Sequence, residues 1–230
     1  MKVLITSGGT TEPIDSVRGI SNFATGGLGK LTAECFLEDG HEVILLAGDK
    51  AVLPQASQRL TIITIMGTEN LYEEMKRCVP LVDVVVHSMA VSDYRPLYMT
   101  GLENFPSVLT ERDLLNFHPH HAKKISSKSN YQIMLLEKTP KIISFIKTWK
   151  PHVLLFGFKL LAGVTEQELI DVAKEKLIST QADFIIANDL EDIKNNQHKA
   201  FIVSTDSIER LHTKSEIADK ILSVSKTYYS

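Results

Sequence analysis

The sequence predicts an α/β protein with a doubly wound parallel sheet, helices on both faces, and a β-hairpin and helix near its C-terminal end. Short β-branched runs alternate with stretches of helical period, which is typical of βαβ units. The connections between them are short, which favours parallel pairing, and right-handed crossovers distribute the helices over both faces. Such a sheet is Rossmann-like. No repeat or change of composition divides residues 1–230, so we expect one domain.

The first half of the chain shows this alternation most clearly. The opening apolar run KVLIT predicts a strand that is buried on both faces. The first helix places Leu31, Cys35 and Phe36 on one side, and Gly40 stands where a helix would stop. The expected elements are strands at residues 2–6, 41–48, 60–66 and 83–90 and helices at residues 31–40 and 68–78.

The second half continues the pattern and ends in a hairpin. Pro140 is tolerated in the first turn of a helix, and Thr165 with Glu168 has capping-box spacing. The turn STDS separates two short strands, and Thr213 with Glu216 predicts a second capping box. The expected elements are strands at residues 131–137, 152–158, 183–189, 199–206 and 208–212 and helices at residues 139–150, from 165 and from 213.

Residues 97–129 do not fit the alternation. This segment has weak periodicity and contains prolines and the run NFHPHHAKK. A long loop inside a compact domain is usually functional or mobile. We expect a long, mobile loop here that serves as a lid or a subunit contact. The adjacent histidines His118, His120 and His121 lack nearby acidic or cysteine residues, so metal binding by them is not expected.

Composition excludes several classes of partner. The formal net charge of −3 gives no general attraction for a polyanion, so nucleic acid and acidic membrane surfaces are not expected partners. No run is long and apolar enough to cross a bilayer, and the opening MKVLIT does not resemble a signal peptide. We therefore expect a cytoplasmic protein. Without a CxxC spacing, Cys35 and Cys78 are interpreted as small buried hydrophobic residues.

The segment TSGGTTEPIDSVRGISNFATGGLGK follows the first strand and leads into the first helix. Ligands of open α/β sheets bind at the carboxyl ends of strands, where a helix N-terminus offers free N–H groups to an anion. The segment lacks the dinucleotide fingerprint, and it is no P-loop because Ala24 replaces the first glycine and Leu31 follows the lysine. It is either an unusual phosphate or carboxylate site or a glycine-rich connection; its polar residues favour binding.

These residues resemble the glycine-rich segment of the phosphopantothenate-cysteine ligase (phosphopantothenoylcysteine synthetase) family. That segment reads approximately G-G-T-x-E-x-I-D-x-V-R-x-I-x-N-x-S-S-G-x-x-G. The motifs AVSDYRP, KTPKII, GFK and IIAND follow in the order of the family, so the resemblance spans nearly the whole chain. The chain is most similar to the monofunctional bacterial form, which begins directly at the ligase.

The resemblance implies a two-step ligation in coenzyme A biosynthesis. The carboxylate of 4′-phosphopantothenate attacks the α-phosphate of CTP, which releases pyrophosphate and leaves an acyl-cytidylate. The amine of L-cysteine then displaces the nucleotide and forms the amide. The site must stabilise accumulating negative charge, usually with Mg²⁺. The family also implies a homodimer with each site near the subunit contact.

The resemblance also assigns roles to single residues. Asn22 matches an essential asparagine whose amide holds the acyl intermediate, and Arg18 matches an arginine that contacts a carboxylate or phosphate. Lys124 matches the first lysine of a basic run that meets the triphosphate. Asp93 matches a contact to the nucleotide or its metal. The residues placed around the substrate phosphate or nucleotide are Gly8, Gly9, Thr10, Thr25, Gly26, Gly29, Asp93, Lys124, Thr139, Pro140, Lys141, Ile142, Phe158 and Lys176.

The chain departs from the family pattern in its cations. Ala24 replaces a serine, Ser126 and Ser127 replace lysines of the basic run, and Thr180 replaces a second nucleotide lysine. CTP remains the preferred nucleotide over ATP.

Two other classes of function stay open. The first is an NAD(P)-dependent reductase, with Asp49 contacting the ribose. Tyr72 and Lys76 have the spacing of short-chain reductases, but an i, i+4 pair on an exposed helix face is the commoner explanation. The second is a non-catalytic nucleotide sensor on the same scaffold.

Overall fold

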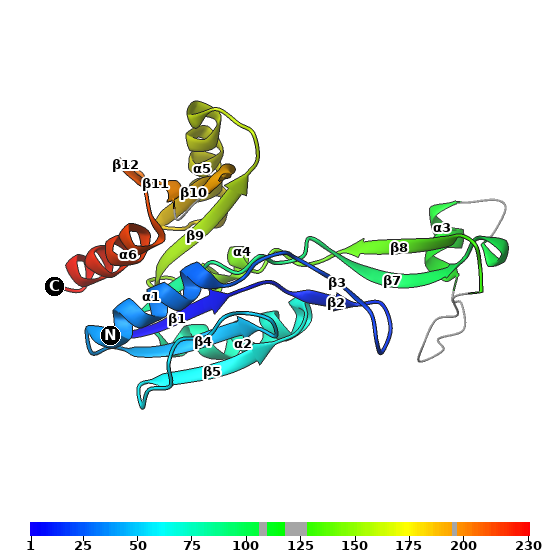
Figure 1. The fold of residues 1–230 in the computed structure, drawn as a ribbon, viewed down its shortest axis with the longest axis horizontal. Coiled ribbons are helices and arrows are strands. Elements are labelled where there is room, and N and C mark those ends of the chain that lie inside the picture. Colours follow the sequence, from blue (N-terminus) through cyan, green and yellow to red (C-terminus); the bar gives the residue numbers. More distant parts are fainter. Residues whose placement is uncertain (106–109, 118–127, 195–196) are drawn as a thin grey trace.

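The computed structural model describes residues 1–105, 110–117, 128–194 and 197–230. A central sheet has the strand order β12-β11-β10-β9-β6-β1-β4-β5 (Figure 1). Its strands are β1 (Lys2–Ser7), β4 (Glu42–Gly48), β5 (Leu60–Ile65), β6 (Val84–His87), β9 (Leu154–Leu161), β10 (Phe184–Lys194), β11 (Gln197–Val203) and β12 (Ile208–Leu211). The six strands β10, β9, β6, β1, β4 and β5 pair with their neighbours in parallel. Strand β11 pairs antiparallel with β10, and β12 pairs antiparallel with β11. The predicted C-terminal hairpin is therefore confirmed.

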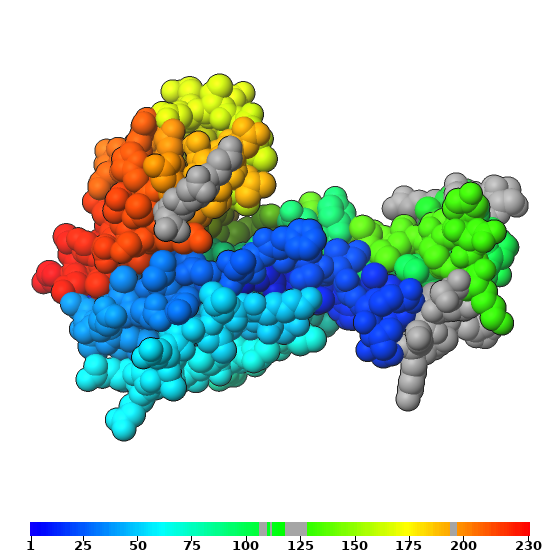
Figure 2. Space-filling model, in the orientation of Figure 1, coloured from blue at the N-terminus to red at the C-terminus, as the bar shows by residue number. Residues whose placement is uncertain are grey.

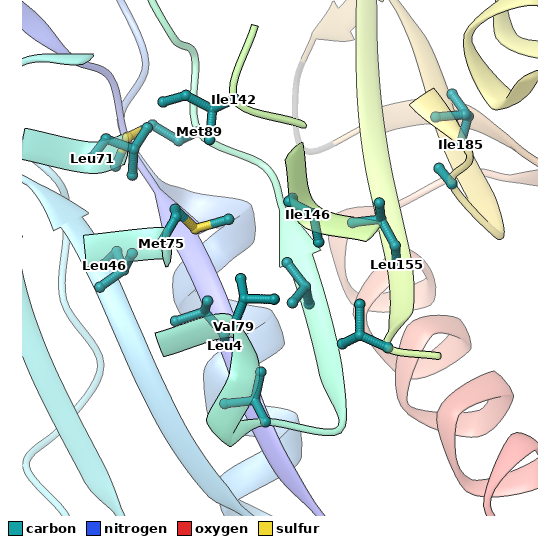
Figure 3. Packing of buried hydrophobic residues seen from close by; sticks show 14 of the residues in the cluster. Leu4, Leu46, Leu71, Met75, Val79, Met89, Ile142, Ile146, Leu155 and Ile185 are labelled. Carbon is teal, nitrogen blue, oxygen red and sulfur yellow. The ribbon is translucent and has the colours of Figure 1, made fainter. Parts of the chain in front are cut away.

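Helices cover both faces of this sheet, as the sequence predicts. One face buries Phe36 of the first helix against the sheet together with Ile217 of the last. The other face buries Met75, Ile146 and Leu169 from three helices, and Figure 3 shows part of this cluster. The first face carries α1 (Gly27–Glu38) and α6 (Lys214–Tyr228), and the second carries α2 (Thr68–Cys78), α4 (Ile143–Trp149) and α5 (Glu166–Thr180). The fold is doubly wound.

A two-stranded arm projects from the body of the molecule (Figures 1 and 2). It consists of β7 (Tyr94–Gly101) and β8 (Gln132–Lys138), paired antiparallel, with η2 (Leu102–Asn104) and α3 (Glu111–Asn116) near its far end. The pairing register shifts at Pro96, because proline has no N–H to donate to the ladder. A short hairpin of β2 (Thr11–Pro13) and β3 (Gly19–Ser21) lies beside the start of this arm.

The prediction of a long irregular loop at residues 97–129 is wrong for the described part of this segment, which contains regular structure. Residues 97–101 belong to β7, and a helix occupies part of the remainder. The strand predicted at 131–137 exists, but it pairs with β7 and not with the central sheet. The predicted mobility and closure over a nucleotide fall largely on residues 106–109 and 118–127, outside the described residues, as do His118, His120 and His121.

Two helix starts and one helix cap also differ from expectation. Helix α1 begins at Gly27, so the end of the glycine-rich segment forms its first turn. Helix α4 begins at Ile143, so Pro140 precedes the helix and does not lie in its first turn. Thr213 accepts a hydrogen bond from the Glu216 N–H, but the Glu216 carboxylate accepts from His212, so this cap is half a capping box. The capping box of Thr165 and Glu168 is complete.

Among the described residues, no helix combines the length and apolar character needed to span a membrane. Cys78 is buried, as expected, and burial raises its pKa. Cys35 is half-buried, and burial together with the neighbouring Asp219 raises its pKa to about 11. Both side chains are therefore neutral thiols near pH 7.

Candidate active site

A cavity of about 500 Å³ opens at the carboxyl ends of β1, β6 and β9. The chain leaves β1 toward β4 on one side and later returns to β6 on the other, so the cavity lies at a topological switch point of the sheet. The start of α1 and the turn before α4 form two of its walls, and residues of α5, β10 and α6 complete it. This is the edge at which the sequence predicts a ligand.

The start of α1 presents backbone to this cavity. Gly26, the N-cap residue, has φ +75°, a left-handed conformation that favours glycine, and it has no side chain to cap the helix; the Gly27 N–H makes a long hydrogen bond of 3.4 Å to Thr25 Oγ1. A Cβ at Gly26 would lie 2.7 Å from Ser7 Oγ, which donates a hydrogen bond to the Gly26 carbonyl oxygen. Uncapped N–H groups and the positive end of the helix dipole make this helix start suited to an anion.

The turn before α4 is tied to the loop that follows β6. The Thr139 N–H donates to the Asp93 carbonyl oxygen at 3.0 Å, and Thr139 Oγ1 donates to the Ser92 carbonyl oxygen at 2.5 Å. At the rim, Lys141 Nζ lies 2.7 Å from Asp93 Oδ1. The motifs AVSDYRP and KTPKII, far apart in the sequence, therefore form one wall of the cavity.

Asn22 supports this wall from behind. Its Nδ2 donates to the Ala90 carbonyl oxygen and to Ser92 Oγ, both at 3.1 Å. Thr10 Oγ1 also lies 3.0 Å from Ser92 Oγ and accepts from the Ser92 N–H. Ala90 and Ser92 both line the cavity. Asn22 thus fixes the position of cavity-lining backbone with a neutral side chain.

The structure brings most of the predicted site residues together. Those that line the cavity are Gly8, Thr25, Gly26, Gly29, Asp93, Pro140, Lys141, Ile142, Phe158 and Lys176. Gly9, Thr10, Asn22 and Thr139 pair with or bond to the residues that form its wall. Their contacts with ligands stay predictions. Lys124 lies outside the described residues, as do Ser126 and Ser127.

Arg18 lies apart from these residues. It is in the turn between β2 and β3, where its carbonyl oxygen accepts from the N–H groups of Ile14 and Asp15. Its Nη2 lies 2.6 Å from Asp15 Oδ2 and its Nε 3.1 Å from the same oxygen. Arg18 does not line the cavity of this chain. Its predicted contact to a carboxylate or phosphate stays a prediction.

Several cavity residues escaped the sequence analysis. Lys159 directly follows Phe158 in the GFK motif, and Lys214 is the first residue of α6. Lys141, Lys159, Lys176 and Lys214 therefore face the cavity, with Asp93 as the one acidic residue that the described chain contributes to its lining. This excess of positive charge offsets the lysines missing from the family pattern and favours a polyanionic ligand. The remaining polar side chains that were missed are His87, Ser88, Ser92, Asn188 and His198.

The residues behind the reductase alternative lie elsewhere. The Tyr72 ring packs edge-on against Phe145 and Trp149, with ring centroids 5.3 Å apart in each pair. Neither Tyr72, Lys76 nor Asp49 lines the cavity. The spacing of Tyr72 and Lys76 is therefore explained by helix packing and surface exposure on α2.

His87 gives the site a pH-dependent effect on stability. The side chain is buried, with Nδ1 3.0 Å from Thr6 Oγ1, and burial, followed by the charge of Lys141, lowers its pKa from 6.5 to about 4. Below pH 6.5 His87 is protonated in the unfolded state, whereas in the folded state it stays neutral until the pH approaches 4. Stability is therefore highest above pH 6.5 and falls as the pH decreases toward 4.

We expect His87→Gln to flatten this dependence. The wild type should lose about 2 kcal/mol of unfolding free energy through His87 between about pH 7 and pH 5. Urea unfolding at several pH values measures the difference between the two proteins. The pKa of His198 is also lowered to about 4, so the variant should keep part of the dependence. Equal pH slopes for variant and wild type would show that His87 ionises normally.

An open α/β sheet with an uncapped glycine-rich helix start and a lysine-lined cavity at its switch point defines a class of phosphate- or nucleotide-binding proteins. The model of the DNA/pantothenate metabolism flavoprotein C-terminal domain family matches residues 1–101 and 115–228. The chain belongs to this family.

Individual relatives agree with this assignment. The coenzyme A biosynthesis bifunctional protein CoaBC of Thermococcus kodakarensis is 31% identical over 224 residues, covering 96% of this chain and 49% of that protein. A crystal structure of the DNA/pantothenate metabolism flavoprotein from Streptococcus pneumoniae is 47% identical, covers 99% of both chains and has a TM-score of 0.94. A crystal structure of the C-terminal domain of a CoaBC protein is 27% identical and has a TM-score of 0.71; the match covers 99% of this chain and 95% of that chain. The chain spans about half the length of the curated CoaBC relatives that match nearly all of it.

Proposed function

We propose that this protein is a phosphopantothenate-cysteine ligase that makes 4′-phosphopantothenoyl-L-cysteine from 4′-phosphopantothenate and L-cysteine in coenzyme A biosynthesis. The observation that carries the proposal is the cavity itself, in which four lysines and the uncapped start of α1 face one space. Membership of the family and the names of relatives as coenzyme A biosynthesis proteins support the choice of substrates.

The first step joins two anions, a carboxylate and a nucleoside triphosphate. The lysines lower the repulsion between them, and the N–H groups at the start of α1 offer fixed donors to phosphate oxygens. We propose CTP as the nucleotide, with Phe158, Lys176 and the turn from Thr139 to Ile142 on the nucleotide side of the cavity. Each of these residues lines the cavity or is bonded to its wall.

The residues present are suited to Mg²⁺ held mainly by the substrate. Mg²⁺ is usually bound through one or two carboxylates together with phosphate oxygens and water. Asp93 provides one carboxylate at the rim, paired with Lys141. Bound there, Mg²⁺ would neutralise phosphate charge during attack on the α-phosphate.

The second step needs a wall that keeps the acyl intermediate in place while the cysteine amine attacks. Neutral donors suit this task, because they orient carbonyl and phosphate oxygens without trapping the leaving nucleotide. Asn22, Thr10 and Ser92 form a neutral hydrogen-bonded group that holds the backbone of this wall in place.

We also propose a cytoplasmic homodimer. The arm supports a subunit contact, because Tyr94, Leu102, Tyr131 and Leu136 expose large apolar side chains on it. Light scattering during gel filtration tests the dimer. A monomer at micromolar concentration would contradict it.

Purified protein incubated with 4′-phosphopantothenate, L-cysteine, Mg²⁺ and either CTP or ATP tests the function. We expect mass spectrometry to detect the amide, with stoichiometric pyrophosphate, when all substrates are present, and faster turnover with CTP. Omission of one substrate at a time provides the controls. Absence of the amide with every nucleotide, or thermal stabilisation by NADPH and not by CTP, would refute the proposal.

A further inference from the structure

The cavity has a third polar wall that contains Lys214 and His198. Helices α1 and α6 pack side by side on one face of the sheet (Figure 1). Lys214 is the first residue of α6, and its Nζ would lie 3.5 Å from a Cβ placed on Gly27, the first residue of α1. Thr25 Oγ1 would lie 3.7 Å from the same point.

The position of the Lys214 ammonium group is unfavourable in the absence of a bound anion. A cation is destabilised at a helix N-terminus, and the ammonium group lies beside the start of α1 while its own residue begins α6. Across the described ranges, Lys214 makes no ion pair. The acidic residue in the first turn of α6, Glu216, accepts a hydrogen bond from the His212 N–H. An anion between the Lys214 ammonium group and the start of α1 would be attracted by both, and would so replace the repulsion between the cation and the helix N-terminus by two favourable interactions.

His198 provides an independent indication of a ligand. Its side chain is 8% exposed and lines the cavity, and Nδ1 is buried without a hydrogen-bond partner in the part of the chain that is described. A buried polar atom without a partner is costly, and native proteins rarely leave one. Burial and the charge of Lys214 lower the pKa of His198, so the ring is neutral and offers one N–H donor.

We infer that Lys214, His198 and the first-turn N–H groups of α1 bind one phosphate group of a substrate. Lys214 supplies the charge, α1 supplies backbone donors, and the neutral His198 ring, which lines the same cavity, supplies one N–H donor. The phosphate belongs either to the triphosphate of the nucleotide or to the phosphomonoester of 4′-phosphopantothenate. The choice of these two compounds as sources of the phosphate rests on the proposed function, whereas the inference that this wall binds a phosphate group does not.

Binding of inorganic pyrophosphate and phosphate, measured by calorimetry, tests the inference without any need for turnover. We expect Lys214→Ala to weaken the binding of at least one of these anions by at least about 10-fold, because charged hydrogen bonds of this kind are lost. His198→Ala should weaken it by about 5-fold, and His198→Gln, which keeps a donor, should restore most of the affinity. Lys220→Ala is the matched control, because Lys220 lies on α6 and pairs with Glu209.

Two further measurements separate a binding role from a structural one. Lys214→Ala should leave the thermal stability of the ligand-free protein unchanged or higher, because it removes a cation from helix N-termini. In the ligase assay, an increased KM for CTP alone assigns the triphosphate, and an increased KM for 4′-phosphopantothenate alone assigns the phosphomonoester. Affinities of the Lys214 and His198 variants within twofold of wild type for both inorganic anions would overturn the inference, whether or not the protein proves to be a ligase.

Discussion

Replacing Asn22 by alanine should lower the rate constant of amide formation by at least about 100-fold while leaving the affinity for CTP within about threefold. The side-chain amide donates two hydrogen bonds, to the Ala90 carbonyl oxygen and to Ser92 Oγ, and so holds the segment after β6 against the glycine-rich segment. Alanine removes both bonds, so the wall that faces the acyl intermediate loses its support. Phe158 on β9 and Lys176 on α5 lie on other elements, and the turn before α4 keeps its own hydrogen bonds to the Ser92 and Asp93 carbonyl oxygens.

Single-turnover assays with 4′-phosphopantothenate, CTP and cysteine measure this effect, and calorimetry with CTP measures binding separately. Asn70→Ala is the matched control, because Asn70 Oδ1 accepts a hydrogen bond from the Met66 N–H outside this cavity. Accumulation of the acyl-cytidylate in Asn22→Ala would place the defect in the second step. Turnover of this variant at the wild-type rate would refute the assigned role.

The part of the site that follows directly from strand order could be predicted from the sequence. In a parallel sheet the carboxyl ends of neighbouring strands meet at one edge, so Gly8 after β1, Asp93 after β6 and Phe158 on β9 had to converge. The helix start at Gly27 was placed four residues too late, because glycines weaken a helical pattern. Gly26 supplies the left-handed turn that starts α1, and this conformation leaves no sign in hydrophobic periodicity.

Other parts depend on contacts between distant segments. Lys214 reaches the cavity because α6 packs against α1, and nothing near Lys214 in the sequence indicates that partner. His198 is a cavity residue because β11 pairs antiparallel with β10 at the end of the sheet. Strand β7 of the arm was missed for a different reason: its residues are mostly half-buried or buried without a regular alternation, and Pro96 interrupts the ladder, so the pattern that reveals a strand is weak.

Gly29→Ala should destabilise the protein by about 3 kcal/mol, although alanine is the better helix former. Gly29 lies in the first turn of α1, pressed against β1. A Cβ built there would lie 2.6 Å from the Ser7 Cβ and 3.2 Å from the Ser7 Cα, and it would overlap the Ser7 Oγ. Rotation of the hydroxyl cannot relieve a clash with Cβ, so α1 must move away from the sheet and carry its N–H groups with it.

Gly27→Ala is the matched control, because its Cβ would meet nothing closer than Lys214 Nζ at 3.5 Å, the end of a flexible side chain. This variant should be as stable as wild type or more stable, by up to about 1 kcal/mol from helix propensity. Urea unfolding measures both. Combining Ser7→Gly with Gly29→Ala should restore part of the loss, since it removes the two closest clashing atoms, and the resulting coupling energy identifies the contact as the cause. Equal stabilisation by alanine at positions 27 and 29 would mean that α1 does not pack this closely on β1, and the phosphate site proposed at its start would lose its fixed donors.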